Sequence, residues 1–317
     1  MIKLRDGLVE LYKKVATSIP KDIEDALKNA VQIETDPTVR EALANTVGAC
    51  IAARTGATAI CEDSGLPVFY ARIPKGLSHQ MVRDVIFDAT RLATEKIPLK
   101  PNAVDSLSGE NSGSNVGASF PMIFLEETDQ STLSIDLMLR GGQTEHLSKT
   151  YRLPESIGCA ELVSELLENG MAGRSLNGVR ACVLDAVLRA QGKGCPPYII
   201  GIGIGGAKEQ VALLSSRQLL RKLHDTNSDP RCAEVEAQLL ADINRLAPGA
   251  TGFPGKTIAL GVKLGVAHRH PESFLVDISF SCWAHRRGRF RRAECGRIPP
   301  FSSAEKKQLL NDEHRAL

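Results

Sequence analysis

Helical and strand patterns alternate along the whole 317-residue chain, and this alternation limits the fold more than any other feature. Apolar residues at helical spacing mark some segments, and short apolar runs bounded by turn residues mark others. The expected helices lie within 1–55, with breaks near 19–22 and 36–37, and at 79–94, 155–170, 175–191, 207–223 and 231–246. The expected strands lie at 66–73, 119–126, 132–139, 198–204, 257–267 and 273–281. Interleaving of this kind predicts the α/β class, with mixed helices and sheets in one large domain over residues 1–317.

Composition argues against several classes of function. Apolar residues make up 43% of the chain and charged residues 24%, which is ordinary for a soluble globular protein. The net charge of +2 gives no reason to expect a nucleic-acid partner. No apolar run approaches the roughly 18 residues of a membrane span, and the N-terminus has no secretory signal pattern. A cytoplasmic location without membrane contact is expected.

Two segments look like nucleotide-binding motifs but stand in the wrong context. Gly201–Gly206 fits G-x-G-x-x-G, yet the region about 20 positions later is a polar loop, where a dinucleotide site needs a strand ending in an acidic residue. Ala250–Thr257 nearly spells a phosphate-binding loop, but a helix precedes it and a strand follows it, which reverses the required order. We interpret the first segment as a tight strand-to-helix turn and expect no nucleotide at either.

Three of the eight cysteines stand in polar turns at the ends of expected strands, where ligands of a site are often found. These are Cys61, Cys195 and Cys282. Cys182 lies in an apolar helical run and should belong to the core, and Cys50, Cys159 and Cys232 also fall in expected helices. Position and spacing alone leave two interpretations of the three turn cysteines open, buried structural thiols and metal ligands.

Seven short segments, taken in order and spacing, carry a resemblance over nearly the whole chain. They are Cys61–Gly65, Pro101–Asp105, the Gly- and Ser-rich Asn111–Gly117, Cys195–Pro197, Gly201–Gly206, Arg269–Pro271 and Cys282–Arg287. In these segments the chain resembles the α subunit of the class I fumarase and L-tartrate dehydratase family, which are iron–sulfur hydro-lyases.

The resemblance implies a [4Fe–4S] cluster held by Cys61, Cys195 and Cys282. Three thiolates leave one iron of the cluster without a protein ligand, and an open metal ion can act as a Lewis acid on a substrate hydroxyl and carboxylate. The implied reaction is reversible hydration and dehydration of a small dicarboxylic acid of the fumarate, malate or tartrate type.

The resemblance also suggests catalytic roles for Asp63 and His270. Asp63 matches the Asp of the family's Cys-Gln-Asp-Thr-Gly motif, which assists proton transfer; the alternative interpretation is a turn or helix-cap residue. His270 matches a family histidine that approaches the substrate. Arg286 and Arg287 either neutralise an anionic cluster and substrate or belong to a solvated basic turn.

Three expected substrate-binding positions depart from the family pattern. Glu62 stands where the family has Gln, and an ionised carboxylate would repel a substrate carboxylate. Lys100 stands where the family has Arg, which removes a bidentate fork. Gln143 replaces the third glycine of a three-glycine turn that begins at Gly141. A retained cluster with an altered substrate is one interpretation of these changes, and weakened activity is another.

The segment after Cys282 is short, polar and Arg-rich. Single-chain members of the family continue into a second domain of different fold that adds substrate contacts. The resemblance therefore implies a separate β subunit, with α–β pairs assembled as a dimer. Two alternatives stay open: a same-family enzyme with a divergent substrate, and a non-catalytic protein whose three Cys and one His hold structural zinc.

Overall fold

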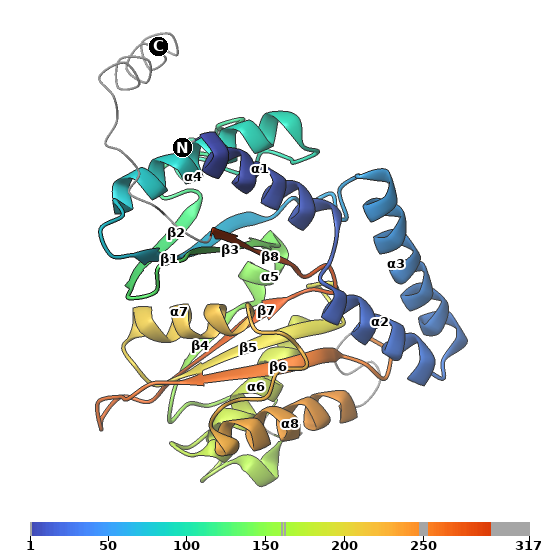
Figure 1. The fold of residues 1–317 in the computed structure, drawn as a ribbon. Helices are drawn as coiled ribbons and strands as arrows, with labels where there is room; N and C mark the ends of the chain where they lie inside the picture. Colours follow the sequence, from blue (N-terminus) through green and yellow to red (C-terminus); the bar gives the residue numbers. More distant parts are fainter. Residues whose placement is uncertain (1, 160, 162, 247–252, 293–317) are drawn as a thin grey trace.

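The chain forms two four-stranded mixed sheets with helices on their faces, as shown by a computed structural model (Figure 1). The structure describes all residues except 1, 160, 162, 247–252 and 293–317. The helices are α1 (Ile2–Thr17), α2 (Lys21–Ile33), α3 (Pro37–Gly56), α4 (His79–Lys96), α5 (Gly142–Leu147), α6 (Leu176–Ala190), α7 (Lys208–Gln218) and α8 (Pro230–Arg245). The strands are β1 (Leu66–Pro74), β2 (Met122–Thr128), β3 (Leu133–Arg140), β4 (Lys149–Arg152), β5 (Tyr198–Ile204), β6 (Ala259–Val266), β7 (Leu275–Ser281) and β8 (Arg286–Arg292). The expected α/β class is confirmed.

The first sheet has the strand order β2-β1-β3-β8, with β1 parallel to β2 and antiparallel to β3. Helices α1 and α4 cover one face, and their apolar sides form a core with the inward residues of β1 and β3. Side chains define where the helices begin: Ser78 accepts a hydrogen bond from the Met81 amide at the start of α4. Asp36 caps α3 in the same way, and Pro37 supplies a preset first turn.

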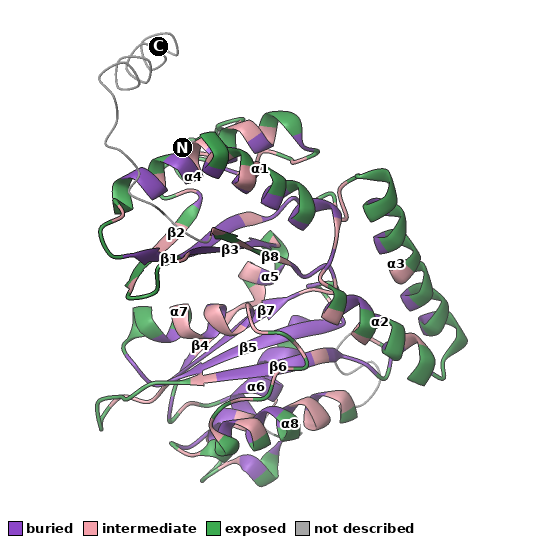
Figure 2. Cartoon of the chain, in the orientation of Figure 1, coloured by how far each residue is buried: buried purple, intermediate pink, exposed green. Residues whose placement is uncertain are grey.

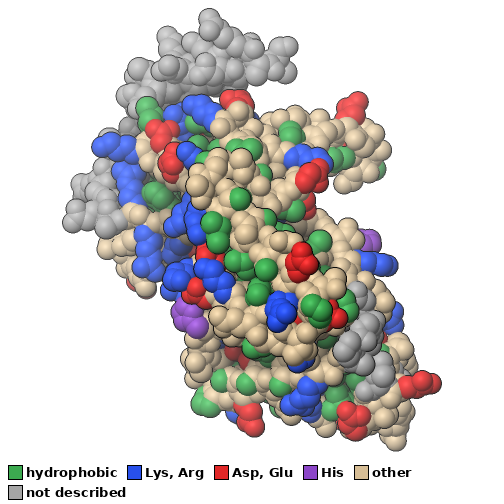
Figure 3. Space-filling view, turned by 90° about the vertical axis from the view of Figure 1, so that its right-hand side faces the viewer, with side chains coloured by type: hydrophobic (Ala, Val, Ile, Leu, Met, Phe, Trp, Pro, Cys, Tyr) green, Lys and Arg blue, Asp and Glu red, His purple; other side chains and the backbone are tan. Residues whose placement is uncertain are grey.

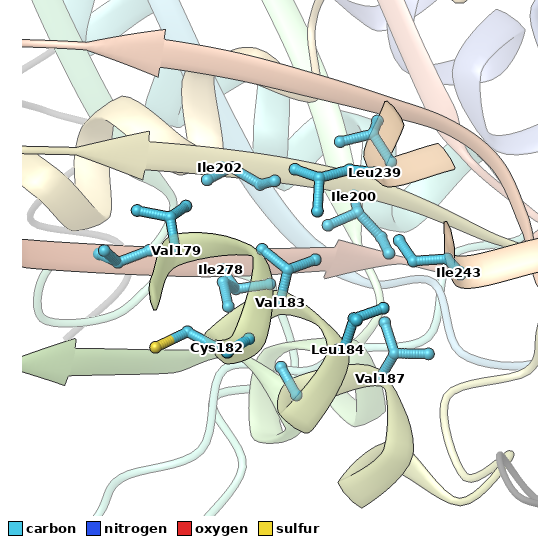
Figure 4. Close-up of a cluster of buried hydrophobic side chains, with 14 of the residues drawn as sticks. Val179, Cys182, Val183, Leu184, Val187, Ile200, Ile202, Leu239, Ile243 and Ile278 are labelled. Carbon is cyan, nitrogen blue, oxygen red and sulfur yellow. The ribbon is translucent and has the colours of Figure 1, made fainter. Parts of the chain in front are cut away.

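The second sheet has the order β4-β7-β5-β6 and is the most deeply buried part of the fold (Figure 2). Helix α7 lies on one face of it, and α6 and α8 lie on the other. Figure 4 shows Cys182 among Val179, Val183 and Ile278 in the core between α6 and this sheet, which confirms its expected core role. A third apolar cluster, which includes Val68, Met138 and Ile199, joins the two sheets.

The glycines of the Gly201–Gly206 segment have a packing role. A Cβ on Gly201 would lie 2.3 Å from the Ser215 carbonyl oxygen, and one on Gly203 would lie 2.5 Å from that of Val211. Glycine at both positions therefore lets α7 approach β5 closely. Gly205 and Gly206 adopt φ angles of +87° and +71° in the turn that leads to α7. This is the tight strand-to-helix turn that the sequence predicts; part of the other rejected motif, residues 250–252, lies outside the described residues.

The expected helix at 155–170 is wrong. The described residues there form turns, two isolated bridges and the short 3-10 helix Ser164–Leu166, so Cys159 is a turn residue. The backbone amides of Gly158 and Cys159 donate to the buried carboxylate of Asp185, at 2.8 and 3.2 Å. The side chain of Asp185, which is distant in the sequence, therefore accepts hydrogen bonds from amides that could otherwise have bonded within a local helix.

Two further boundaries differ from expectation. Helix α7 ends at Gln218, five residues earlier than predicted. The Arg-rich segment, for which a solvated basic turn is one of two interpretations, forms β8, an edge strand antiparallel to β3. Its charges are compatible with a strand because Asp136 pairs with Arg289 and Asp22 pairs with Arg287. None of the described helices is long and apolar enough to cross a bilayer.

Candidate active site

The fold brings Cys61, Cys195 and Cys282 to one region from three distant parts of the chain. Cys195 precedes β5 and Cys282 follows β7, and the pairing of Ile199 with Ser281 sets these two strand ends side by side. The Trp283 amide donates to the Cys195 carbonyl at 3.2 Å, which joins the two cysteine segments directly. Cys61 enters from the turn between α3 and β1.

The three thiols are close enough to influence one another's protonation. Burial raises the pKa of Cys282 to about 11, the Arg286 charge opposes this rise, and the Cys195 and Cys61 thiols add to it. Burial, and then Cys61, raise the pKa of Cys195. Effects of this kind act between neighbouring groups, so the three thiols lie near one another.

A single metal ion and a cluster place different demands on these three thiols. Among the described residues, no three Cys, His, Asp or Glu side chains stand close enough together to hold one metal ion. A zinc ion draws its sulfur ligands to about 2.3 Å, which demands a tight group. A [4Fe–4S] cluster binds each thiolate through a different iron and therefore accepts thiolates that lie farther apart. The donor set of three thiols fits such a cluster with one iron left open.

Cys195 is held in a conformation that few residues adopt. Its φ angle is +57°, in the left-handed region that is uncommon for residues other than glycine. The preceding amide, that of Gly194, donates to the Tyr198 hydroxyl at 3.3 Å. A Cβ on Gly194 would lie 2.5 Å from a Leu147 methyl group and 3.0 Å from a Tyr198 ring carbon, so a larger residue there would require these side chains to shift. The surrounding structure thus fixes the position of this thiol.

The carboxylate of Asp63 connects three loops. One oxygen accepts from the Gly65 amide at 2.8 Å and from the Asn102 side chain at 3.1 Å. The other oxygen accepts from the Gly142 amide, the first residue of α5, at 2.9 Å. Asp63 is therefore both a turn residue and a cap for α5. A carboxylate has about four acceptor positions, and these hydrogen bonds use three of them.

The backbone around Asp63 is closely packed. Gly65 has a φ angle of +82°, and a Cβ there would lie 2.8 Å from the Arg140 carbonyl oxygen. Arg286 is buried and donates to the Asp63 carbonyl oxygen at 2.6 Å. This contact excludes the interpretation of Arg286 as part of a solvated turn. It also places a guanidinium charge between Asp63 and Cys282.

Glu62 and Lys100, two of the three departures from the family pattern, form an ion pair with each other. Both side chains are exposed, and the hydrogen bond that Lys100 donates to Glu62 is the main cause that raises the pKa of Lys100. The third departure, Gln143, is an exposed residue of α5 next to the Gly142 amide that binds Asp63. All three positions therefore border the Asp63 loop, and the two charged ones neutralise each other.

His270 is the one predicted site residue that the fold does not bring to the cysteines. It is exposed in the turn between β6 and β7, which extends to the lower left in Figure 1. The pairing of Ile204 with Val276 puts that turn at the opposite end of β5 from Cys195. At about 3.3 Å per strand residue the two ends are roughly 20 Å apart. Within one chain, His270 therefore lies far from the end of the sheet that carries Cys195 and Cys282.

Sequence reasoning did not identify the polar residues that support the site. Asn102 binds Asp63, and Asn115 in turn accepts from the Asn102 amide at 2.7 Å. Arg140 is buried at the end of β3, where it pairs with Glu145, although its Nε has no well-aligned hydrogen bond among the described residues. The available signal was weak: the Pro101–Asp105 and Asn111–Gly117 segments stood out only as motifs, without roles for single residues.

A buried histidine next to the site should make the fold sensitive to acid. The Leu219 carbonyl accepts from Nε2 of His285 at 2.9 Å, so Nδ1 accepts from the Ser281 hydroxyl at 2.7 Å. Burial, and then the Arg287 charge, lower the pKa of His285 to about 3. The unfolded chain binds this proton near pH 6.5 and the folded chain does not, so stability falls as the pH drops below 6.5.

We expect His285 to contribute a loss of about 2 kcal/mol in the free energy of unfolding between pH 7 and pH 5. Urea unfolding of the wild type and of His285→Gln, measured at both pH values, isolates this contribution because glutamine does not titrate. The variant should lose less stability over this interval. Equal losses in the two proteins would show that His285 does not resist protonation in the fold.

Comparison with known proteins supports the relationship suggested by the motifs. Residues 5–291 match the family described as "Fumarate hydratase (Fumerase)". The chain is 37% identical to a "Putative fumarate hydratase class I" of Geobacillus stearothermophilus, over 90% of this chain and 54% of that protein. It is 31% identical to a "Putative L(+)-tartrate dehydratase subunit alpha" of Methanocaldococcus jannaschii, over 90% of this chain and 96% of that protein.

An "L(+)-tartrate dehydratase subunit alpha" of Escherichia coli K12 is 27% identical over 90% of this chain and 89% of that protein. The chain thus spans about half the length of the Geobacillus relative and nearly the full length of the two subunits. The match covers both sheets and all three turn cysteines. The chain belongs to the fumarate hydratase (Fumerase) family.

Proposed function

We propose that this chain is the α subunit of a [4Fe–4S]-dependent hydro-lyase that reversibly hydrates and dehydrates a small dicarboxylic acid. The observation that carries this proposal is the convergence of three thiols, Cys61, Cys195 and Cys282, beside a carboxylate held by three hydrogen bonds. The names of the relatives support the reaction class, because they are fumarate hydratase and tartrate dehydratase.

In this proposal the three cysteines hold the cluster. When bound, the cluster supplies an open iron that can act as a Lewis acid toward a substrate oxygen. Arg286 offsets part of the negative charge of the bound group, since it already opposes the pKa rise of Cys282. The strained backbone of Cys195 and the glycine before it keep one thiol in place before the cluster assembles.

Asp63 is proposed as the group that moves the proton. Its carboxylate is fixed by the Gly65 and Gly142 amides and by Asn102, so it needs little reorganisation when a substrate binds. Its free acceptor position can take a proton from the carbon next to the one that carries the hydroxyl, and can return it in the hydration direction. Asn102 is then a positioning residue that keeps the carboxylate oriented.

A divergent substrate is the second candidate, and the Glu62–Lys100 ion pair favours it. A free cation at the edge of the site would attract a carboxylate, but here the Lys100 ammonium group already forms an ion pair with Glu62. This arrangement suits a substrate that presents a hydroxyl or amine to the pair in place of a second carboxylate. The zinc alternative receives no support from the described residues, because no group of them is compact enough for one ion.

We also propose a β subunit as partner, with α–β pairs assembled as a dimer in the cytoplasm. The relatives of matching length are named as alpha subunits, and the longer Geobacillus relative extends well beyond the matched region. The β subunit would supply the substrate contacts that the exposed Glu62, Lys100 and Gln143 face. The seven described cysteines are unpaired, which agrees with a reducing compartment.

An iron without a thiolate ligand should make the enzyme sensitive to oxygen. We expect exposure to air to remove iron and activity in parallel, because the open iron is accessible to oxidants. Treatment with ferrous iron and a thiol under argon should restore both. The measurement follows iron content and hydro-lyase activity of the α–β pair over the same time course. Activity that persists in air after the iron is gone would contradict the proposed cofactor.

A further inference from the structure

A second site candidate lies away from the cysteines, in a cleft between the first sheet and the segment that follows α7. Its cavity volume is about 650 Å³, within the usual range for small-molecule sites. The lining contains seven Lys and Arg side chains but only three Asp and Glu. None of the three cysteines, Asp63, Glu62 or Lys100 belongs to it. Figure 3 shows Lys and Arg side chains gathered in a band at the left margin of that view.

Strand geometry accounts for the concentration of charge. Arg287, Arg289 and Arg291 occupy every second position of β8, so they share one face of the sheet. Tyr70 and Arg72 are likewise two positions apart on β1, so they also share one face of the sheet. The register between the strands therefore brings these side chains into one cleft. The rigid sheet fixes the backbone positions from which they project.

Four of the seven cations already have acidic partners. Arg289 forms two hydrogen bonds with Asp136, and Arg217 lies 3.5 Å from Glu126. Arg221 lies 2.8 Å from Asp225, and Arg287 pairs with Asp22, although its buried Nε has no hydrogen-bond partner among the described residues. These pairs consume all three acids of the lining, so they contribute little net charge.

The other three cations, Arg72, Lys222 and Arg291, are exposed and have no ion-pair partner within the described part of the chain. The register places Arg72 opposite Ser134 on β3, and Ser134 opposite Arg291 on β8. Opposite residues of a sheet project to the same side, so Arg72, Ser134 and Arg291 form one row. Ser134 is 8% exposed, and its hydroxyl lacks a hydrogen-bond partner among the described residues.

We propose that this cleft binds a small polyanion with three or more negative charges, carried on phosphoryl or carboxylate groups. Guanidinium groups suit both ligand types because their planar fork matches two oxygens at once. Arg72 and Arg291 supply two charged donors from the sheet, and Lys222 adds a third charge from the segment after α7. The ligand would compensate the three unpaired charges. This inference does not depend on the proposed hydro-lyase function.

The test is calorimetric titration of the full chain with tripolyphosphate and, separately, with citrate at about 0.15 M salt, where diffuse attraction is largely screened. We expect saturable one-to-one binding of at least one of the two anions, and the pattern identifies the preferred acidic group. The variant Arg72→Gln/Arg291→Gln should bind at least about tenfold more weakly, the effect expected for lost charged hydrogen bonds. Both side chains are exposed and unpaired, so the fold should tolerate the change.

The matched control is Arg40→Gln/Arg152→Gln, which removes the same charge from two exposed arginines outside the cleft. It should bind within about twofold of the wild type. Equal weakening in both variants would show that net charge alone attracts the anion and would overturn the proposal. Absence of saturable binding by either anion would overturn it as well.

Discussion

Replacing Cys61, Cys195 or Cys282 by Ser should each abolish the visible absorbance of the anaerobically reconstituted protein. Loss of an outer hydrogen bond at a metal site typically costs 10- to 100-fold, so loss of a thiolate ligand should lower activity by more than about 100-fold. Serine keeps the size of each side chain but is a far weaker ligand for iron. The measurements are the absorption spectrum and the iron and sulfide content of each variant.

The matched controls are Cys50→Ala and Cys182→Ala. Both thiols are buried in apolar clusters and are not proposed as ligands, and burial raises the pKa of Cys50 to about 11. These variants should bind iron normally, with at most a modest loss of stability. If one of the three turn cysteines is dispensable for cluster assembly, or if Cys182→Ala prevents it, the proposed ligand set is wrong.

The motifs predict which cysteines converge but do not predict how they are held. Cys61, Cys195 and Cys282 stand out because each lies in a turn at a strand end, and the register of β5 and β7 then sets two of them together. The left-handed backbone of Cys195 and the hydrogen bond from the preceding Gly194 amide to Tyr198 depend on contacts formed only in the folded chain. Local sequence contains no signal for such contacts.

Long-range side-chain contacts also explain the errors in secondary structure. The amides of Gly158 and Cys159 are paired by Asp185, a residue of α6, so a segment with helical spacing remains irregular. The Arg-rich sequence of β8 does not predict a strand, because the residues that neutralise its charges, Asp22 and Asp136, lie far away in the chain. His270 shows the same limit: its motif suggests a role, but its position along the sheet separates it from the cysteines.

The double change Glu62→Gln/Lys100→Arg should alter the Michaelis constant by about tenfold or more, in a direction that depends on the substrate. In the wild type the two side chains pair with each other, which leaves no free cation for a carboxylate. The variant replaces this pair by an amide donor and a free guanidinium fork. If the substrate is fumarate, malate or tartrate, one added charged hydrogen bond should lower its Michaelis constant by about that factor.

If the substrate instead presents a hydroxyl or amine to Glu62, the same change should raise the Michaelis constant for that substrate. The single variants separate the two contributions, because Glu62→Gln alone releases Lys100 while Lys100→Arg alone preserves an ion pair. Both side chains are exposed, so the fold should be unaffected. The assay uses the α–β pair and a panel of diacids and amino diacids. Equal constants for all variants and substrates would show that these positions do not contact substrate.

Mössbauer spectroscopy of the protein reconstituted with iron-57, recorded with and without a hydroxy diacid, tests the central claim most directly. Three cysteine ligands predict four irons per chain, of which one changes its spectrum when the substrate binds. The same sample of a Cys282→Ser variant should contain no intact cluster. Four irons that all keep their spectrum in the presence of every hydroxy acid tested, or a protein that takes up zinc and no iron, would contradict the account.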